Sequence, residues 1–206
     1  MAHQVRVRGA HACFTRPEFK AERVSYPVLT PSAARGILEA VYWSPDVRWQ
    51  VQRIKVLRPV EWLLLARNEV SKKAVPRRRL DGEQLYHLPP ERLRQTRSSL
   101  VLKNVDYVVT AVLQPCPATP HPARHDAIFT RRLRHGQVFQ QPYLGCREFP
   151  AVVERMSNEE EIASEWRESE PIELGWVLAD PGYRAGAVAR FFQAVISPCG
   201  VIECPA

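Results

Sequence analysis

The amino-acid sequence predicts an α+β fold, and three observations support this prediction. Several segments rich in Val, Ile and Leu have the apolar pattern of strands, and two segments of helical periodicity lie between them. The chain has 206 residues, of which 45% are hydrophobic and 25% charged, enough for one substantial domain with or without a smaller appendage. Its 18 prolines against 9 glycines predict stiff, numerous loops.

The best-defined element is a helix within residues 25–45. Thr30 is a good N-cap, and Pro31 suits the first helical position, where a missing N–H costs nothing. Ser44 and Pro45 end the helix. The apolar residues at helical spacing are Ala33, Ala34, Ile37, Leu38 and Val41. This stripe predicts one packed face.

The same helix has a second, more polar face. Arg35, Glu39 and Tyr42 follow one another at i, i+4 and i+7 and therefore share this face. Two interpretations remain open at this point. The face is either part of the scaffold, which is the more common outcome, or it presents a site.

Other segments of the N-terminal part have strand character. The predicted strands are residues 4–8, 47–57, 60–70 and 100–114. In the second of them the apolar alternation changes phase, which indicates a β-bulge near Gln52 and Arg53. Residues 71–99 form a long stretch that contains eight lysines and arginines. A loop of that length inside a compact domain is usually functional or disordered.

A second helix is predicted over residues 123–135. The proline-rich residues 115–122 stop the preceding strand, and Gly136 suits the position just after the helix. The apolar side chains expected to face the core are Ile128, Phe129 and Leu133. Further strands are predicted around residues 143–145 and over residues 172–178, 187–196 and 201–204. An acidic loop or short helix is expected at residues 156–170.

This element order favours a ferredoxin-like or RRM-like domain followed by a small antiparallel β-sheet domain. We expect the N-terminal domain to span residues 1–140, with a basic insertion at about residues 71–99. The small β-rich domain is expected to span residues 141–206. No internal repeat is visible in the sequence.

Charge is distributed unevenly along the chain. The net charge is +7, and residues 151–206 hold only 4 of the 29 Lys and Arg but 10 of the 22 Asp and Glu. A basic body suggests a polyanionic partner, and the acidic C-terminal part is either a solvated face or a contact with a basic neighbour. Five cysteines without a C-x-x-C pair, the absence of a signal peptide and the absence of a long apolar run predict a reduced, cytoplasmic protein without a membrane segment.

Motifs for several enzyme classes are absent. His121 and His125 lie four residues apart, but Pro122 between them and the lack of nearby acidic or cysteine pairs argue against a metal site. No glycine-rich phosphate loop, dinucleotide motif or nucleophile elbow is present, and no cofactor is expected. A basic body with scattered aromatic residues is typical of proteins that bind RNA or single strands.

His125 is a candidate for proton transfer. It follows Arg124 at the start of the second predicted helix, where the helix N-terminus disfavours a protonated imidazole. Metal-free RNA cleavage needs a base for the ribose 2′-OH, cations for the charged transition state and a proton for the leaving oxygen. Judged from composition alone, a surface histidine on a basic helix is the more common explanation.

Five segments of the chain, in order, resemble a known family. They are residues 14–18 (FTRPE), 25–43 (SYPVLTPSAARGILEAVYW), 53–60 (RIKVLRPV), 67–70 (RNEV) and 131–151 (RRLRHGQVFQQPYLGCREFPA). The chain resembles the Cas-five family of CRISPR-associated RAMP proteins, in its subtype I-C (Dvulg) branch. The resemblance implies an RRM-like (RAMP) domain followed by a small β-sheet domain, in agreement with the element order.

The resemblance also implies a function. Members of this branch are metal-independent endoribonucleases that cut pre-crRNA at the repeat hairpin and stay bound to the 5′ handle beside the other Cas subunits of the type I-C interference complex. The alternative is a non-catalytic subunit that binds the crRNA handle, as in other branches. A third possibility, a metal-dependent DNA nuclease, lacks a carboxylate cluster to hold the metal.

The family's catalytic residues are a Tyr at the end of the first helix and a Lys-His pair at the start of the second. They map onto Tyr42, Arg124 and His125, so that Arg replaces Lys. A guanidinium holds a phosphate well but does not readily release a proton, and we therefore expect an electrostatic role for Arg124. Tyr42 is expected to lie outside the core and near His125, and a Tyr42 within the core would indicate that the helix is only a scaffold. The RNA-binding candidates are Arg23, Arg35, Arg77, Arg78, Arg79, Arg131 and Arg132.

Overall fold

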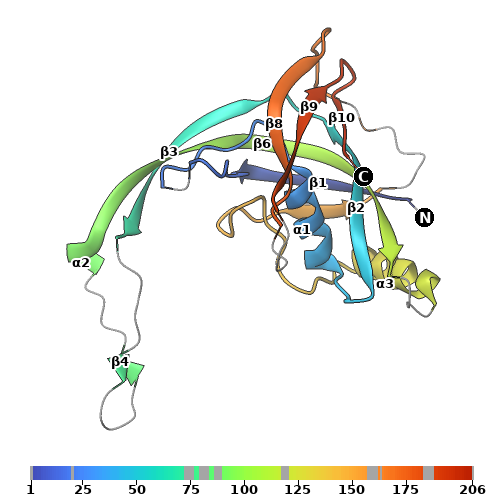
Figure 1. Ribbon diagram of the computed structural model, residues 1–206, viewed down its shortest axis with the longest axis horizontal. Coiled ribbons are helices and arrows are strands. Elements are labelled where there is room, and N and C mark those ends of the chain that lie inside the picture. The colour runs from blue at the N-terminus through green and yellow to red at the C-terminus, as the bar shows by residue number, and fades with distance from the viewer. Residues whose placement is uncertain are drawn as a thin grey trace.

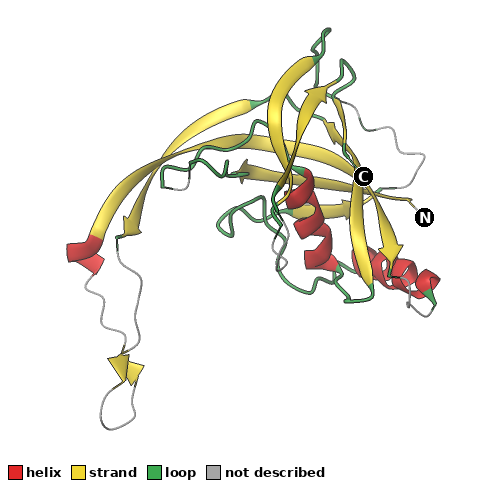
Figure 2. Ribbon diagram, viewed as in Figure 1, coloured by secondary structure: helices red, strands yellow, loops and turns green. Residues whose placement is uncertain are grey.

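The fold is known from a computed structural model, and it consists of antiparallel sheets and helices (Figures 1 and 2). The structure describes the chain except residues 1, 20, 72–76, 79–83, 86–89, 117–120, 157–161, 163, 183–187 and 206. The strands are β1 (Ala2–Ala12), β2 (Val47–Val56), β3 (Glu61–Val70), β4 (Arg77–Arg78), β5 (Gln84–Leu85), β6 (Arg94–Pro115), β7 (Val152–Arg155), β8 (Ile172–Asp180), β9 (Arg190–Ile196) and β10 (Val201–Glu203). The helices are α1 (Pro31–Val41), α2 (Pro90–Leu93) and α3 (Pro122–Arg134).

The main sheet is built around β6, which has 22 residues. The strand order is β10-β2-β6-β1-β7, and every pairing between neighbours is antiparallel. The C-terminal half of β6 pairs with β2, and its N-terminal half pairs with β3. Figure 1 shows that β3 and this half of β6 leave the body of the protein as a long curved arm. Two further hairpins, β4–β5 and β8–β9, form sheets of their own.

One residue of β6 with a left-handed backbone lies where the pairing of this strand changes from β3 to β2. Asn104 has a φ of 51°, in the left-handed region that few residues other than glycine adopt. It lies directly after the segment paired with β3, which ends at Lys103, and before the segment paired with β2, which begins at Tyr107. The β1–β6 register also skips one residue on each strand here, from Gly9–Val105 to His11–Lys103. The backbone of Asn104 therefore interrupts the regular strand where its pairing partner changes.

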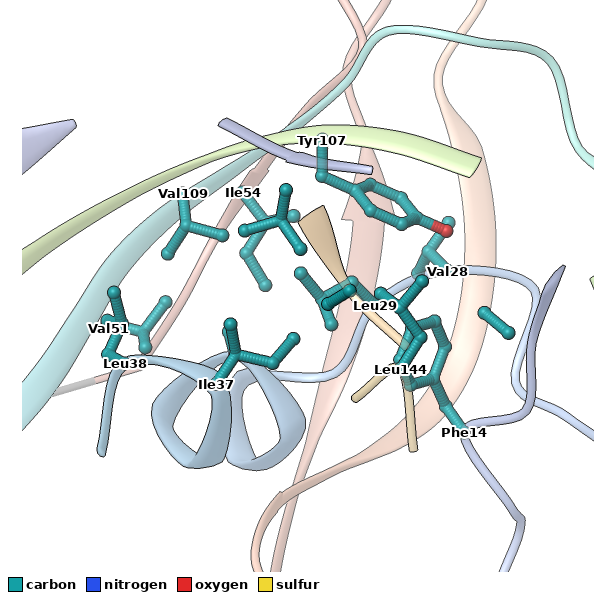
Figure 3. Packing of buried hydrophobic residues seen from close by; sticks show 14 of the residues in the cluster. Phe14, Val28, Leu29, Ile37, Leu38, Val51, Ile54, Tyr107, Val109 and Leu144 are labelled. Carbon is teal, nitrogen blue, oxygen red and sulfur yellow. The ribbon is translucent and has the colours of Figure 1, made fainter. Parts of the chain in front are cut away.

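The expected first helix is confirmed as α1. The Thr30 hydroxyl oxygen accepts a hydrogen bond of 3.2 Å from the Ala33 N–H, as its position as N-cap predicts. The predicted apolar stripe is buried at Ala34, Ile37, Leu38 and Val41. Figure 3 shows Ile37 and Leu38 directed at Val51 and Val109 of the sheet. Burying one such side chain contributes about 1.5–3 kcal/mol, so this face holds α1 on the sheet.

Two sequence predictions about strands differ from the structure. The basic insertion was expected to reach residue 99, but residues 94–99 belong to β6 and pair with β3. These residues are polar on both faces of the strand, so the sequence shows no apolar alternation that would predict it. Cross-strand contacts, such as the hydrogen bond from Thr96 to Asn68, stabilise the strand instead.

Residues 143–145 are not a strand. Tyr143 forms one isolated bridge with Pro150, and Gly145 has a φ of 81°. A Cβ on Gly145 would lie 2.1 Å from the carbonyl oxygen of Cys13. The loop therefore approaches the end of β1 more closely than a strand residue with a side chain would allow.

Other predictions about strands agree with the structure. The predicted bulge in β2 occurs between Val51 and Arg53. β8 and β9 form the expected antiparallel hairpin, while β7 and β10 join the main sheet beside β1 and β2. Among the residues that the structure describes, no helix is long and apolar enough to span a membrane.

Replacement of Gly145 by alanine is expected to destabilise the protein. The new Cβ meets backbone that cannot move aside and the residue keeps a positive φ, so the free energy of unfolding should fall by about 2–3 kcal/mol. Gly36→Ala is the matched control, because a Cβ on Gly36 in α1 meets nothing within 4 Å. Urea denaturation checks both variants. Equal stabilities would contradict the proposed close approach at Gly145.

Candidate active site

Tyr42 is fixed at the end of α1 through its backbone. Its N–H donates to the Leu38 carbonyl at 2.9 Å, and its φ of −145° takes the chain out of the helix. Its carbonyl accepts a hydrogen bond of 3.1 Å from the indole N–H of Trp49 on β2. Tyr42 is therefore held between the helix end and the sheet, and its side chain has little freedom to move.

The start of α3 places His125 opposite Tyr42. His121 has a φ of 54° and turns the chain, and Pro122 begins the helix as its first residue. One turn after His125, the fully buried Phe129 packs edge-on against Trp49, with ring centroids 4.4 Å apart. Because Trp49 contacts both helices, α1 and α3 are held on the same sheet strand, and the first turn of α3 faces the last turn of α1.

Tyr42 and His125 form a direct hydrogen bond. The tyrosine hydroxyl lies 2.8 Å from Nδ1 of the imidazole, and the ring centroids are 6.0 Å apart. This bond occupies one ring nitrogen and leaves Nε2 as the other candidate for proton transfer. The side chains are almost buried, with 7% of Tyr42 and 8% of His125 exposed. The predicted proximity of these two residues is confirmed.

The expectation that Tyr42 lies outside the core is wrong, and the direct catalytic role expected for Tyr42 is not supported. Its ring belongs to the main hydrophobic cluster. The last turn of α1 packs on β2, so the ring is covered, and the hydrogen bond with His125 satisfies its polar end. Tyr42 in this conformation is placed to orient the imidazole.

Arg132 completes the immediate surroundings of this pair. Its guanidinium lies 5.2 Å from the centroid of the Tyr42 ring and donates a hydrogen bond of 2.8 Å to the Val41 carbonyl. It thereby covers the aromatic ring and pairs with a carbonyl in the last turn of α1. Arg124 and Arg131 are exposed on the same helix as His125. They supply positive charge without a described carboxylate partner.

The other predicted RNA-binding residues lie elsewhere. Arg23 contacts Glu148 and donates to the Cys146 sulfur at 3.2 Å, and Arg35 contacts Asp180 at 3.0 Å. Arg77 and Arg78 form β4, where the structure gives the backbone only. Arg79 lies outside the described residues. The structure therefore brings Tyr42, His125 and Arg132 together, with Arg124 and Arg131 on the same helix, and separates Arg23 and Arg35 from them.

Sequence reasoning missed a second polar pair beside this site. The His3 Nε2 lies 2.5 Å from a carboxylate oxygen of Asp126, and the His3 ring packs edge-on against Phe129. Asp126 directly follows His125, so the pair fixes the first turn of α3 to β1. No spacing in the sequence indicates this contact, because His3 and Asp126 lie at opposite ends of the N-terminal region. Within the described part of the chain, no group of three or more His, Cys, Asp or Glu could hold a metal ion.

Comparisons with known proteins identify the family. The family model Cas_Cas5d, described as a CRISPR-associated protein (Cas_Cas5), matches residues 4–195. A protein of Mannheimia succiniciproducens named CRISPR pre-crRNA endoribonuclease Cas5d is 39% identical over 218 residues, covering 100% of this chain and 96% of that protein. This chain therefore belongs to the Cas5d family of CRISPR-associated proteins.

Two further similarities agree with this assignment. A Thermus thermophilus protein of the same name is 51% identical over 150 residues, which cover 72% of this chain and 61% of the relative. A crystal structure described as a CRISPR-associated protein has a TM-score of 0.74 at 24% identity and covers 100% of this chain and 92% of its own. The structural match shows that the fold is shared.

Tyr42→Phe is expected to remove the hydrogen bond to His125 and little else. Loss of one buried hydrogen bond should lower the free energy of unfolding by about 1 kcal/mol, and the imidazole signals of His125 should shift in the NMR spectrum. Tyr143→Phe removes a hydroxyl from a distant loop and serves as the control. Unchanged His125 signals in Tyr42→Phe would contradict the proposed orienting contact.

Proposed function

We propose that this chain is a CRISPR repeat-specific, metal-independent endoribonuclease. It cuts pre-crRNA and stays bound to the 5′ handle beside other Cas subunits of a type I-C interference complex. The observation that carries this proposal is the hydrogen bond between Tyr42 and His125, at the junction of two helices that are distant in sequence. Support also comes from the relatives that are named pre-crRNA endoribonucleases.

The proposed reaction is an internal transesterification. A base removes the proton of the ribose 2′-OH, the 2′ oxygen attacks the adjacent phosphorus, and the bond to the 5′ oxygen breaks. The products are a 2′,3′-cyclic phosphate and a 5′-OH, which receives the transferred proton. His125 exchanges protons through Nε2, since Nδ1 is engaged by Tyr42. Tyr42 acts as a positioning residue that holds the ring in one orientation.

Arg124 stabilises the charge of the phosphate in this proposal. Its side chain is exposed and directly precedes His125 in the first turn of α3, where the amide dipoles also favour an anion. A guanidinium forms two parallel hydrogen bonds to phosphate oxygens. Arg131, exposed on the same helix, is the second cation proposed to meet the RNA backbone.

A second function is supported by a specific observation. His125 and Tyr42 are almost buried, and Arg124 stands where related enzymes have lysine, as the family resemblance implies. A subunit that binds the crRNA handle without cutting it has no need for an accessible imidazole. Tight binding without cleavage by the purified protein would establish this alternative.

We also propose a finer description of the fold and a cellular location for the protein. The order β7-β1-β6-β2, with α1 and α3 as the intervening helices, supports a ferredoxin-like core. The separate β8–β9 hairpin supports a small C-terminal domain within residues 141–206, although β7 and β10 of this segment pair with the main sheet. Five free cysteines support a cytoplasmic location.

His125→Ala is expected to abolish cleavage while binding to the repeat hairpin stays nearly intact. Removing a proton-transfer group should slow the reaction by about 10²–10⁴-fold, whereas one buried imidazole contributes little to an ionic interface. Single-turnover cleavage in EDTA and a filter-binding assay measure the two quantities. His135→Ala, at an exposed position after the same helix, is the matched control.

Two outcomes would contradict the proposed chemistry. Cleavage of a substrate with a 2′-deoxy nucleotide at the cut site excludes attack by the 2′ oxygen. A dependence on added divalent metal excludes a metal-independent reaction. Cleavage that persists in His125→Ala would overturn the role of this residue alone.

Charge reversal at Arg77, Arg78 and Arg79 is expected to weaken RNA binding without changing the cleavage rate of bound RNA. These consecutive arginines lie in the basic segment after β3, and reversal of three phosphate contacts should reduce the slope of log K against log salt by about 2. Reversal of Arg53, which pairs with Glu203 on the surface, is the control. An unchanged salt dependence would exclude this segment from the interface.

A further inference from the structure

A hollow of about 380 Å³ lies beside the polar face of α1. Arg35, Gly36 and Glu39 contribute its helical wall, and Leu178 and Pro181 at the end of β8 contribute to the opposite side. The hollow is separate from the hydrogen bond between Tyr42 and His125, whose residues do not line it. We call it the base hollow, after the nucleobase that we propose below as its ligand.

The lining of the base hollow suits a planar, hydrogen-bonding ligand. Phe14, Tyr26 and Tyr143 line it, and Tyr143 is the most exposed of the three, because Phe14 and Tyr26 are buried and the Arg16 guanidinium lies 4.8 Å from the centroid of the Tyr26 ring. An exposed aromatic ring accepts the flat face of a nucleobase. Glu39 provides a carboxylate at one side. The pKa of Glu39 is raised, mainly because the side chain is buried. The guanidinium of Arg35 opposes this increase, and the negative charge of Asp180 adds to it. A partly desolvated carboxylate gains from N–H donors and repels phosphate, so an amino-bearing base fits better than a phosphate.

A second hollow of about 180 Å³ shares one lining residue, Arg35, with the base hollow. Arg35, Arg48 and Arg190 line this second hollow together with Asp180, and we call it the phosphate hollow. Asp180 contacts Arg35 at 3.0 Å and Arg190 at 3.9 Å. Arg35 also forms an ion pair of 3.7 Å with Glu39, so three guanidinium groups face two carboxylates and the net charge is still positive. Guanidinium groups suit phosphate oxygens.

Asp180 organises this cluster as an ionised group. Burial alone would raise its pKa, but the Gly182 N–H and the Arg35 guanidinium outweigh burial and lower the pKa of Asp180. It therefore keeps its negative charge and fixes Arg35 between the two hollows.

We propose that the two hollows together bind one nucleotide of the RNA, with an amino-bearing base in the base hollow and its phosphate in the phosphate hollow. The ligand class rests on the proposed RNA-binding function. Arg35 lies at the junction, which gives a location to one predicted RNA-binding residue. Arg48 and Arg190 were not found from the sequence, because β2 and β9 lie far apart in the chain.

Gly36→Leu tests the base hollow with little risk to the fold. A Cβ at Gly36 meets nothing within 4 Å, and leucine favours a helix more than glycine does. The added side chain therefore fills the hollow from its helical wall. Ala127→Leu, which adds the same apolar group at an exposed position of α3, is the matched control.

The probes are GMP, CMP, AMP and UMP, with ribose 5-phosphate as a ligand that has no base. Binding followed by NMR titration should favour the three amino-bearing nucleotides over UMP in the natural protein. Gly36→Leu should weaken GMP binding at least tenfold and leave ribose 5-phosphate binding unchanged. Arg190→Ala should weaken the binding of GMP and ribose 5-phosphate alike. Ala127→Leu should change neither.

Nucleotides that fail to bind, or that bind Gly36→Leu as well as the natural protein, would overturn the nucleotide site. A basic peptide that binds instead would assign the hollow to a partner protein and would also overturn it. Failure of the proposed function can be distinguished from failure of the nucleotide site. It appears as absent RNA cleavage and absent hairpin binding, in assays that do not use mononucleotides. A protein that cuts RNA with an unaffected Gly36→Leu variant would contradict only the nucleotide site.

Discussion

The arrangement of the candidate active site depends on Trp49. This one side chain donates a hydrogen bond to the Tyr42 carbonyl and packs edge-on against Phe129. Through these contacts a single residue of β2 fixes the end of α1 and the first turns of α3. The short distance between Tyr42 and His125 follows from the packing, since neither residue has a local sequence signal that would bring them together.

A consequence is that the stability of the fold and the proposed chemistry depend on the same atoms. Tyr42 belongs to the hydrophobic core and His125 is buried beside it, so the imidazole is held by packing and by one hydrogen bond. Such preorganisation favours a reaction that requires a fixed ring orientation. Arg124 and Arg131 differ from this pair, because their side chains are exposed and leave the core undisturbed; their contact with an RNA backbone is part of the proposed function.

Much of the fold could be predicted from the sequence. The start of α1 at Pro31 after its Thr30 cap, the bulge beside Gln52 and the end of α3 near Gly136 depend on local residues that restrict the backbone directly. The ends of the arm formed by β3 and the first half of β6 could not be predicted from the sequence. Its two strands are stabilised by contacts with each other, and their sequences show little apolar periodicity. The site required the family resemblance to connect Tyr42 with His125. The contact of His3 with Asp126 and the cluster around Asp180 required three-dimensional pairing of distant segments.

β6 serves two purposes as one continuous strand, and Asn104 lies where its pairing changes. After this residue β6 pairs with β2 in the core sheet. Before it β6 pairs with β3, first at Val101 and Leu102, which are buried in the core, and then in an arm that leaves the body (Figure 1). Because a covalent strand joins the two parts without a loop, the direction of the arm depends on the backbone of the central strand, which includes the left-handed residue Asn104. The span of RNA that the protein could contact at once is therefore a property of local backbone geometry as well as of chain length.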